Sequence, residues 1–270
     1  MKYWQLIVEP APLPGARNMA VDEHLFLLAA KSEARTFLRF YQWHRTTASL
    51  GYSQEAAEVV DLDFCCRHGV DVVRRMTGGK LVLHHHEVTY ALASSDGEIF
   101  SESVRDSYRL ISLALLKGLE FMGLAARMAE ATPPSYARGT MPCFAYAARD
   151  EIEIGGRKIV GSAQKRFGPV FLQHGSIPLE PDDGLLAAVS SPGRPEHAPG
   201  RGMTSLSEAA GRAVDFASAV ASLSRGFADF FGVALVPFAL GPEDESAVAD
   251  LQVRKYGADD WTIHRKPGSR

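Results

Sequence analysis

Residues 156–179 contain the pattern that most restricts the fold of this chain. An apolar segment at Ile159-Val160 lies between two glycines and is typical of a strand. Residues 169–179 are typical of a second strand, which returns after a turn at Phe167-Gly168. The pattern therefore predicts that a pair of consecutive strands, and with it a sheet, lies in this part of the chain.

Cys143 precedes these strands, in polar, small-residue surroundings that are typical of a loop, where a thiol is reachable. Lys158 occupies a strand position between Gly156 and Gly161, from which its side chain can be aimed. An ammonium group near a thiol stabilises the thiolate and lowers the thiol pKa from its ordinary value of about 8.5. We predict a Cys143/Lys158 dyad for covalent acyl transfer. The alternative is a small buried cysteine and a solvated lysine.

A second candidate region covers residues 72–92. Gly78 and Gly79 lie between two strand-like segments and are flanked by basic residues, so the backbone here can approach a ligand closely. Such a loop can hold a phosphate or polarise a carbonyl group. It is not a P-loop, because the G-x-x-x-x-G-K-[ST] spacing is absent and Leu81 follows the lysine.

The histidine run in this region raises the question of a metal site. Successive side chains of a strand point to opposite faces, so at most His84 and His86 share one face. No cluster of Cys or His with metal-ligand spacing lies nearby in the sequence. We therefore expect solvated or hydrogen-bonded histidines and no metal.

Bulk properties narrow the class of protein. No apolar run approaches the roughly 20 residues that span a bilayer, and the N-terminus lacks a signal peptide. Three cysteines (Cys65, Cys66 and Cys143) form no disulfide framework. The net charge of -3 argues against a nucleic-acid partner. A soluble, cytoplasmic protein is expected, with no membrane contact.

Periodicity and capping residues predict the remaining elements. They are an edge strand or arm at 1–8, a helix at 18–31 capped by Asn18, strands at 36–43 and 48–52, helices at 61–68 and 101–122, a strand at 124–128, helices at 182–189, 215–231 and 243–255, and a strand at 261–264. Asp22 and Glu23 are interpreted as first-turn acids favoured by the helix dipole. Strands and helices in this irregular order favour an α+β fold, with a mixed, largely antiparallel sheet covered by helices.

These motifs resemble the biotin/lipoate protein ligase family. GRKIVGSAQ at 156–164 and QHGSIPL at 173–179 follow the family's order, and NMAVDE at 18–23 resembles its N-M-A-x-D-E. RRMTGGKLVLH at 74–84 resembles its R-R-x-[ST]-G-G-G-x-V-x-H. A cysteine 15 positions before Lys158 is similar to the octanoyltransferases of the LipM type.

The resemblance implies one biotin/lipoyl protein ligase-like catalytic domain over residues 1–270, with a core at about 30–240 and a short C-terminal helix and strand at 243–265. The substrate-binding residues that it implies are Arg74, Arg75, Thr77, Gly78, Gly79, Lys80, His84, Gly161, Ser162, Ala163, His174 and Gly175. Lys80 departs from the family pattern, because ATP-using relatives have a third glycine there. Its side chain would obstruct an adenylate.

The implied activity is ping-pong transfer of an octanoyl group from octanoyl-acyl carrier protein, through a Cys143 thioester, to the lysine of a lipoyl domain such as that of the glycine cleavage H protein. No cofactor is required, and a monomer is expected. An apolar tunnel would contribute roughly 5 kcal/mol for an eight-carbon chain. Acidic partner proteins would meet a basic rim formed by Arg74, Arg75, Lys80, Arg157, Lys165 and Arg166.

Three alternatives stay open at this point. An ATP- and Mg-dependent lipoate ligase shares the fold and does not need Cys143. A thioester hydrolase would pair Cys143 with His174, and water would resolve the acyl-enzyme. A non-catalytic binding module would tolerate replacement of Cys143.

Overall fold

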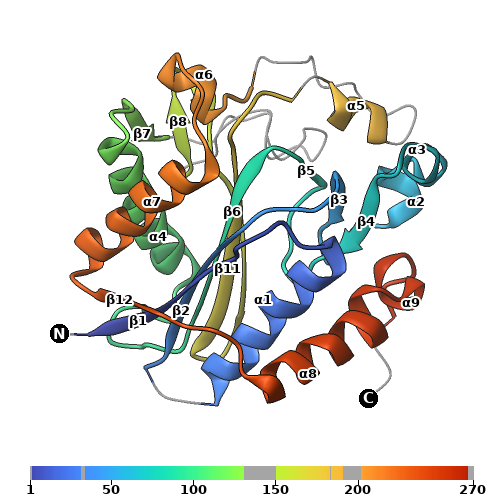
Figure 1. The fold of residues 1–270 in the computed structure, drawn as a ribbon, viewed down its shortest axis with the longest axis horizontal. Coiled ribbons are helices and arrows are strands. Elements are labelled where there is room, and N and C mark those ends of the chain that lie inside the picture. The colour runs from blue at the N-terminus through green and yellow to red at the C-terminus, as the bar shows by residue number, and fades with distance from the viewer. Residues whose placement is uncertain (1, 32–33, 131–149, 183, 191–201, 267–270) are drawn as a thin grey trace.

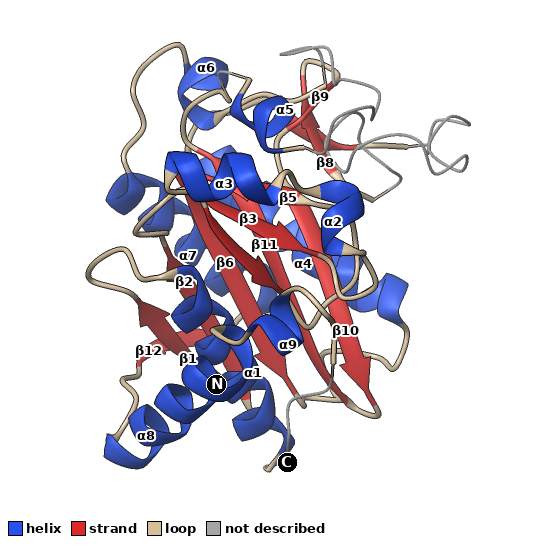
Figure 2. Cartoon of the chain, turned by 90° about the vertical axis from the view of Figure 1, so that its right-hand side faces the viewer, coloured by secondary structure: helices blue, strands red, loops and turns tan. Residues whose placement is uncertain are grey.

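The computed structural model describes residues 2–31, 34–130, 150–182, 184–190 and 202–266. Within these ranges the strands form one six-stranded sheet and two three-stranded sheets. Helices lie on both faces of the large sheet (Figures 1 and 2). The predicted α+β fold with a mixed sheet is confirmed.

The large sheet has the strand order β10-β11-β6-β2-β1-β12. Neighbouring strands from β10 to β2 are antiparallel, whereas β2, β1 and β12 are parallel. The bounds are β1 Tyr3–Val8, β2 Thr36–Tyr41, β6 Glu87–Ser94, β10 Gly161–Phe167, β11 Val170–Pro178 and β12 Ala234–Pro237. The strand pair predicted around Gly168 is β10 and β11. The expectation that β1 is an edge strand is wrong, because β1 lies between β2 and β12. The sequence pattern did not reveal β12.

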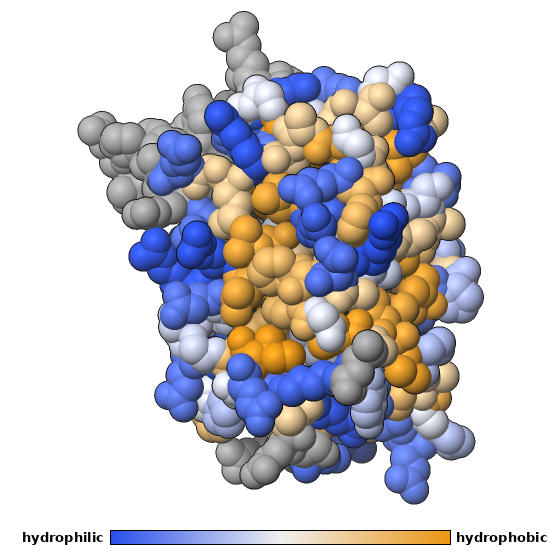
Figure 3. Space-filling model, turned by 90° about the vertical axis from the view of Figure 1, so that its left-hand side faces the viewer, coloured by the Kyte–Doolittle hydropathy of each residue, from blue (hydrophilic) through white to orange (hydrophobic). Residues whose placement is uncertain are grey.

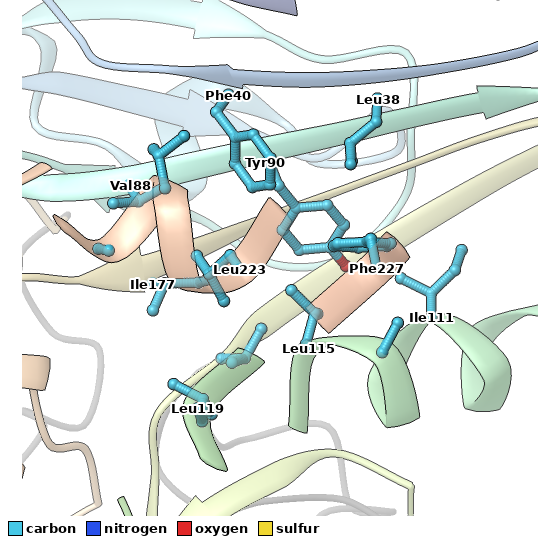
Figure 4. Packing of buried hydrophobic residues seen from close by; sticks show 14 of the residues in the cluster. Leu38, Phe40, Val88, Tyr90, Ile111, Leu115, Leu119, Ile177, Leu223 and Phe227 are labelled. Atoms are coloured by element: carbon cyan, nitrogen blue, oxygen red, sulfur yellow. The ribbon is translucent and has the colours of Figure 1, made fainter. Parts of the chain in front are cut away.

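Helices α4 (Val104–Phe121) and α7 (Phe216–Phe231) cover one face of the sheet. Both were predicted, and the side chains of Ser103 and Asp215 cap their N-termini. Figure 4 shows the apolar side chains that fill the space between these helices and strands β2, β6 and β11. The two helices cross where Gly118 meets Gly226. Burial of each large apolar side chain in this layer contributes about 1.5–3 kcal/mol.

Helix α1 (Gly15–Ala30) lies on the opposite face, with α8 (Pro242–Leu251) packed outside it (Figure 1). The helix begins earlier than predicted, after Pro14, because proline suits the entry to a first turn. Asn18 is therefore not its N-cap. This residue is buried inside the helix, and its side chain donates to the carbonyl oxygens of Leu13 and Gln42.

The described part of the C-terminal segment consists of helices joined by turns. A π-helical turn at Gln252–Tyr256 continues α8, and α9 covers Asp259–Thr262. The predicted strand at 261–264 is thus wrong. Two acidic residues in the first turn of α9 favour the helix through its dipole.

The two small sheets have the orders β4-β3-β5 and β7-β8-β9. Their strands are β3 Thr47–Leu50, β4 Asp71–Arg74, β5 Val82–His84, β7 Ala126–Met128, β8 Ile152–Ile154 and β9 Arg157–Lys158. Strand β3 pairs with β4 and β5 and not with β2, although the two predicted strands at 36–43 and 48–52 are consecutive in the sequence. The first small sheet therefore separates from the large one and can lie over its end.

Short helices complete the described chain: α2 Ala56–Val59, α3 Leu62–His68, α5 Leu185–Val189 and α6 Leu206–Ala210. The predicted helix at 61–68 is α3, which is capped by Asp61 and Gly69. Cys65 is buried and Cys66 is exposed. Figure 3 shows the side of the molecule that carries α4 and α7, where hydrophobic residues gather in the middle and hydrophilic residues surround them.

Candidate active site

A pocket lies where the first small sheet (β4-β3-β5) faces the large sheet. It is lined by Met19, Tyr41, Trp43, Ser49, Arg75, Val82, His84, Thr89, Gly161, Ser162, Ala163, His174, Gly175 and Ser176. The set includes seven of the twelve predicted substrate-binding residues. The folded chain thus brings together residues 75–84 and 161–175, which the sequence placed in separate motifs.

The glycine loop is held by Arg75, whose guanidinium group lies beneath it. One nitrogen donates to the carbonyl oxygen of Ser49 at 2.7 Å, and the other donates to the carbonyl oxygens of Gly78 at 3.0 Å and Lys80 at 2.7 Å. Gly79 has a φ of 95°, which a side chain would disfavour. The loop is therefore shaped by an arginine that is itself almost fully buried.

Gly51 allows this loop its close approach to the preceding strand. A Cβ atom at Gly51 would lie 2.0 Å from the carbonyl oxygen of Gly79. Sequence reasoning did not single out Gly51, although its place directly after a strand, in SLGYSQ, was visible.

Arg74, one of the predicted substrate-binding residues, does not line the pocket. It is fully buried, and it donates to the carbonyl oxygens of Gly51, Tyr52, Gln54, Trp261, Thr262 and Ile263, at 2.6 to 3.4 Å. The side chain thus ties the loop after β3 to the C-terminal segment. An exposed basic rim that includes Arg74 and Arg75 is the wrong expectation, because neither guanidinium group is at the surface. Arg157 is paired with Glu208 at 2.6 Å.

Asp22 organises the wall of the pocket that α1 contributes. It is 1% exposed, and its carboxylate accepts from Arg39 at 2.8 Å and from Tyr41 and His174 at 2.9 Å. Burial, together with Asp22, raises the pKa of Tyr41 well above its ordinary value, so its hydroxyl group stays a donor. The expectation of first-turn acids is wrong for both Asp22 and Glu23, because the helix begins at Gly15, seven residues before Asp22.

His174 connects Asp22 to the glycine loop. Burial lowers the pKa of His174, so its ring is neutral at neutral pH. A carboxylate can only accept, so Nδ1 carries the proton toward Asp22, and Nε2 accepts from the Thr77 hydroxyl group at 2.7 Å. The two contacts fix the tautomer and hold Thr77 next to Gly78 and Gly79.

Glu87 organises the opposite wall in the same way. Its carboxylate accepts from His84 at 2.8 Å, Ser176 at 2.6 Å, Trp43 at 3.2 Å and the hydroxyl group of Thr89. Burial opposes ionisation, but His84, with hydrogen bonds from the hydroxyl groups of Ser176 and Thr89, holds the pKa of Glu87 below its ordinary value. Sequence reasoning missed Glu87, because an acid at the start of a strand carries no periodic signal.

Lys158 is fully buried, and its ammonium group pairs with Glu151 at 2.7 Å. A paired carboxylate lets a buried lysine keep its charge. Lys158 does not line the pocket, but it lies three residues before Gly161, which does, so the two Cα atoms are within about 11 Å. Cys143 and the predicted dyad distance lie outside the described residues.

The described residues contain neither a metal-ion cluster nor a membrane-spanning helix. No group of three or more His, Cys, Asp or Glu residues there could hold a metal ion. Among the helices described, none is both long and apolar enough to cross a membrane.

Comparison with known proteins gives a consistent family. A model of the lipoyl protein ligase A/B catalytic domain matches residues 14–228. The chain is 36% identical to octanoyltransferase LipM of Symbiobacterium thermophilum, covering 97% of this chain and 98% of that one. It is 35% identical to octanoyltransferase LipM of Brevibacillus brevis, covering 98% and 100%.

Two solved structures share the fold. Lipoate-protein ligase A bound with ATP superposes with a TM-score of 0.82 and 23% identity, covering 97% of this chain and 99% of that one. A bi-partite lipoate protein ligase from Thermoplasma acidophilum has a TM-score of 0.82 and 21% identity, covering 100% and 99%. At these identities the likeness concerns the fold alone.

Proposed function

The chain belongs to the family of lipoyl protein ligase A/B catalytic domains, and we propose that it moves an octanoyl group from octanoyl-acyl carrier protein, through a thioester on Cys143, to the lysine of a lipoyl domain. Identity of about 35% over nearly the whole chain to octanoyltransferases makes it an octanoyltransferase of lipoate biosynthesis rather than a lipoate ligase. The acyl donor, the cysteine route and the glycine cleavage H protein as acceptor belong to the proposal.

One observation carries the proposal beyond the family. Met19, Trp43 and Val82 contribute apolar groups to the pocket, and polar side chains in and behind its walls are hydrogen-bonded to one another, as in the pairs Trp43–Thr89, Ser49–His84 and Thr77–His174. An apolar acyl chain is the ligand that such a pocket accepts at least cost, because burying unpaired polar groups would cost several kcal/mol. Its carbonyl end would then lie toward the segment that contains Lys158.

The chemistry has two steps. The Cys143 thiolate attacks the thioester carbonyl of the donor, the new C–S bond forms, and the thiolate of the carrier leaves and takes up a proton. The neutral lysine amine of the acceptor then attacks octanoyl-Cys143, the nitrogen gives up one proton to solvent as the amide forms, and the C–S bond breaks to release the Cys143 thiolate. In this scheme Lys158 stabilises the thiolate and the developing oxyanion, and neither ATP nor another cofactor is needed.

The structure also bears on the hydrolase alternative. Both ring nitrogens of His174 are engaged, by Asp22 and by Thr77. A histidine that serves as the base for Cys143 needs a free nitrogen directed at the thiol. This observation favours aminolysis over a Cys143/His174 hydrolase.

Intact-protein mass tests the proposal. Wild type and Cys143→Ala are each mixed with octanoyl-acyl carrier protein without ATP, and we expect an added octanoyl mass on wild type alone. Adding a lipoyl domain should then move that mass to the acceptor. The proposal fails if wild type forms no adduct and octanoyl or lipoyl transfer appears only after free acid and ATP are added.

A further inference from the structure

We propose that Glu87 is the positioning residue that sets the shape of the acyl pocket, and through it the preference for one chain length. The inference rests on the proposed function, since it takes an acyl chain as the ligand. Glu87 does not line the pocket itself; it is 3% exposed and lies behind the wall. It therefore acts through the side chains that it holds.

Four residues of the pocket wall converge on this one carboxylate. His84, Trp43 and Thr89 donate to Oε1, and Ser176 donates to Oε2. These four residues come from β5, β6, β11 and the segment after β2, so no single element fixes their relative positions. Glu87 supplies the common anchor.

The most important pair on this anchor is Trp43 with His84. Their rings stack at 3.9 Å between centroids and 13° between planes. The indole nitrogen donates to Glu87 at 3.2 Å and to Thr89 at 2.7 Å, while the imidazole Nδ1 donates to Glu87 at 2.8 Å. One carboxylate oxygen thus holds both rings of a flat wall in register.

The hydrogen-bond pattern suits an ionised carboxylate, because four donors meet its two oxygen atoms and all four can be accepted. In Glu87→Gln the NH2 group can face only Ser176, whose hydroxyl group must then accept and not donate. The remaining three donors meet a neutral oxygen, and hydrogen bonds to a neutral acceptor are weaker than those to a carboxylate. The substitution keeps the size of the side chain, which isolates the loss of the charge that holds the wall residues.

A competition among acyl donors of different chain length measures the effect of Glu87 on chain-length preference. Equimolar hexanoyl-, octanoyl- and decanoyl-acyl carrier proteins compete for one lipoyl domain, and the acylated products are counted by mass. The product ratio does not depend on how much enzyme is folded, so a loss of stability alone leaves it unchanged. We expect Glu87→Gln to lower the octanoyl-to-decanoyl ratio about fourfold, the factor that corresponds to one buried methylene group.

Two further variants make the outcome decisive. Asp96→Asn changes another buried carboxylate just beyond the far end of β6, roughly 30 Å along the strand from Glu87, and should keep the wild-type ratio. Thr89→Val removes the hydroxyl group between Trp43 and Glu87, and should shift the ratio in the same direction by a smaller factor. Thr89→Val decides the matter if Glu87→Gln does not fold.

The results separate this inference from the proposed function. Wild type that transfers none of the three acyl groups contradicts the function itself. Wild type that transfers them, with the same ratio in Glu87→Gln and Thr89→Val, overturns the role of Glu87. An equal shift in Asp96→Asn also overturns it, because the ratio would then report general loosening of the fold.

Discussion

Replacing Asp22 by asparagine tests whether this carboxylate is the buried counter-charge of Arg39. Arg39 is fully buried, and its guanidinium group lies 2.8 Å from Asp22 and 2.8 Å from Glu9. Asparagine keeps the size of the side chain and one accepting oxygen, but removes the charge. It also places an NH2 group against the donors of Tyr41 and His174.

The size of the loss in unfolding free energy distinguishes between two roles of Asp22. Breaking a buried pair costs about 3–5 kcal/mol, and because Glu9 remains beside Arg39 we expect the lower end, about 3 kcal/mol. An acid that only complements a helix dipole would contribute about 0.3–1 kcal/mol. Asp63 is the matched control, since it is exposed and lies in the first turn of α3; Asp63→Asn should therefore cost less than about 1 kcal/mol.

Urea unfolding at pH 7, followed by circular dichroism, measures both variants. A loss for Asp22→Asn no larger than that for Asp63→Asn would refute the counter-charge argument. The double variant Asp22→Leu/Arg39→Met adds a second check, because it removes the buried guanidinium group together with Asp22 and leaves unpaired only Glu9, whose side chain is 15% exposed. It should be more stable than Asp22→Leu alone.

Three further predictions concern the packing of α7 at Gly226, the titration of His174 and the hydrogen bonds of Arg74. Gly226→Ala would place a Cβ atom 2.3 Å from the backbone nitrogen of Gly118, so α7 and α4 must separate; we expect a loss of about 1–3 kcal/mol by urea unfolding. The pKa of His174 is lowered in the folded state, so the unfolded chain binds its proton first as pH falls below about 6.5. Stability should therefore fall from pH 7 to pH 5.5, and His174→Gln should remove that part of the decrease in urea midpoint. Arg74→Lys replaces a five-donor fork by one ammonium group and leaves buried carbonyls unpaired, so thermal and urea unfolding should show a loss of at least about 2 kcal/mol.

Long periodic elements and glycine turns were predictable because their signals are local. The apolar spacing in α4 and α7, with Ser103 and Asp215 as caps, follows from helix geometry alone. Strand β12 was not predictable, since ALVP after a glycine is equally consistent with a loop. Its strand conformation comes from pairing with β1, a contact across more than 200 residues that no local pattern records.

The residues of the candidate site likewise differ in whether a local sequence pattern reveals them. Arg75, His84 and His174 belong to motifs whose resemblance to a family placed them at a ligand, and the structure brings all three to one pocket. Asp22 and Glu87 were misinterpreted or missed, because a buried carboxylate is identified by its partners and not by its neighbours in sequence. The donors that surround each of them come from at least two elements far apart in the chain.

The two buried carboxylates explain how a pocket with polar walls can hold an apolar chain. Asp22 accepts a hydrogen bond from the Nδ1–H group of His174, and the Nε2 atom of His174 accepts one from the hydroxyl group of Thr77. Glu87 does the same through His84, whose Nε2 accepts from Ser49 at 2.7 Å. In both series of hydrogen bonds, Thr77–His174–Asp22 and Ser49–His84–Glu87, each hydroxyl and ring proton is donated toward the carboxylate. The hydroxyl protons of Thr77 and Ser49 therefore need no partner in the pocket. An acyl chain can then enter without leaving a buried donor unpaired, which would cost about 1–3 kcal/mol for each group.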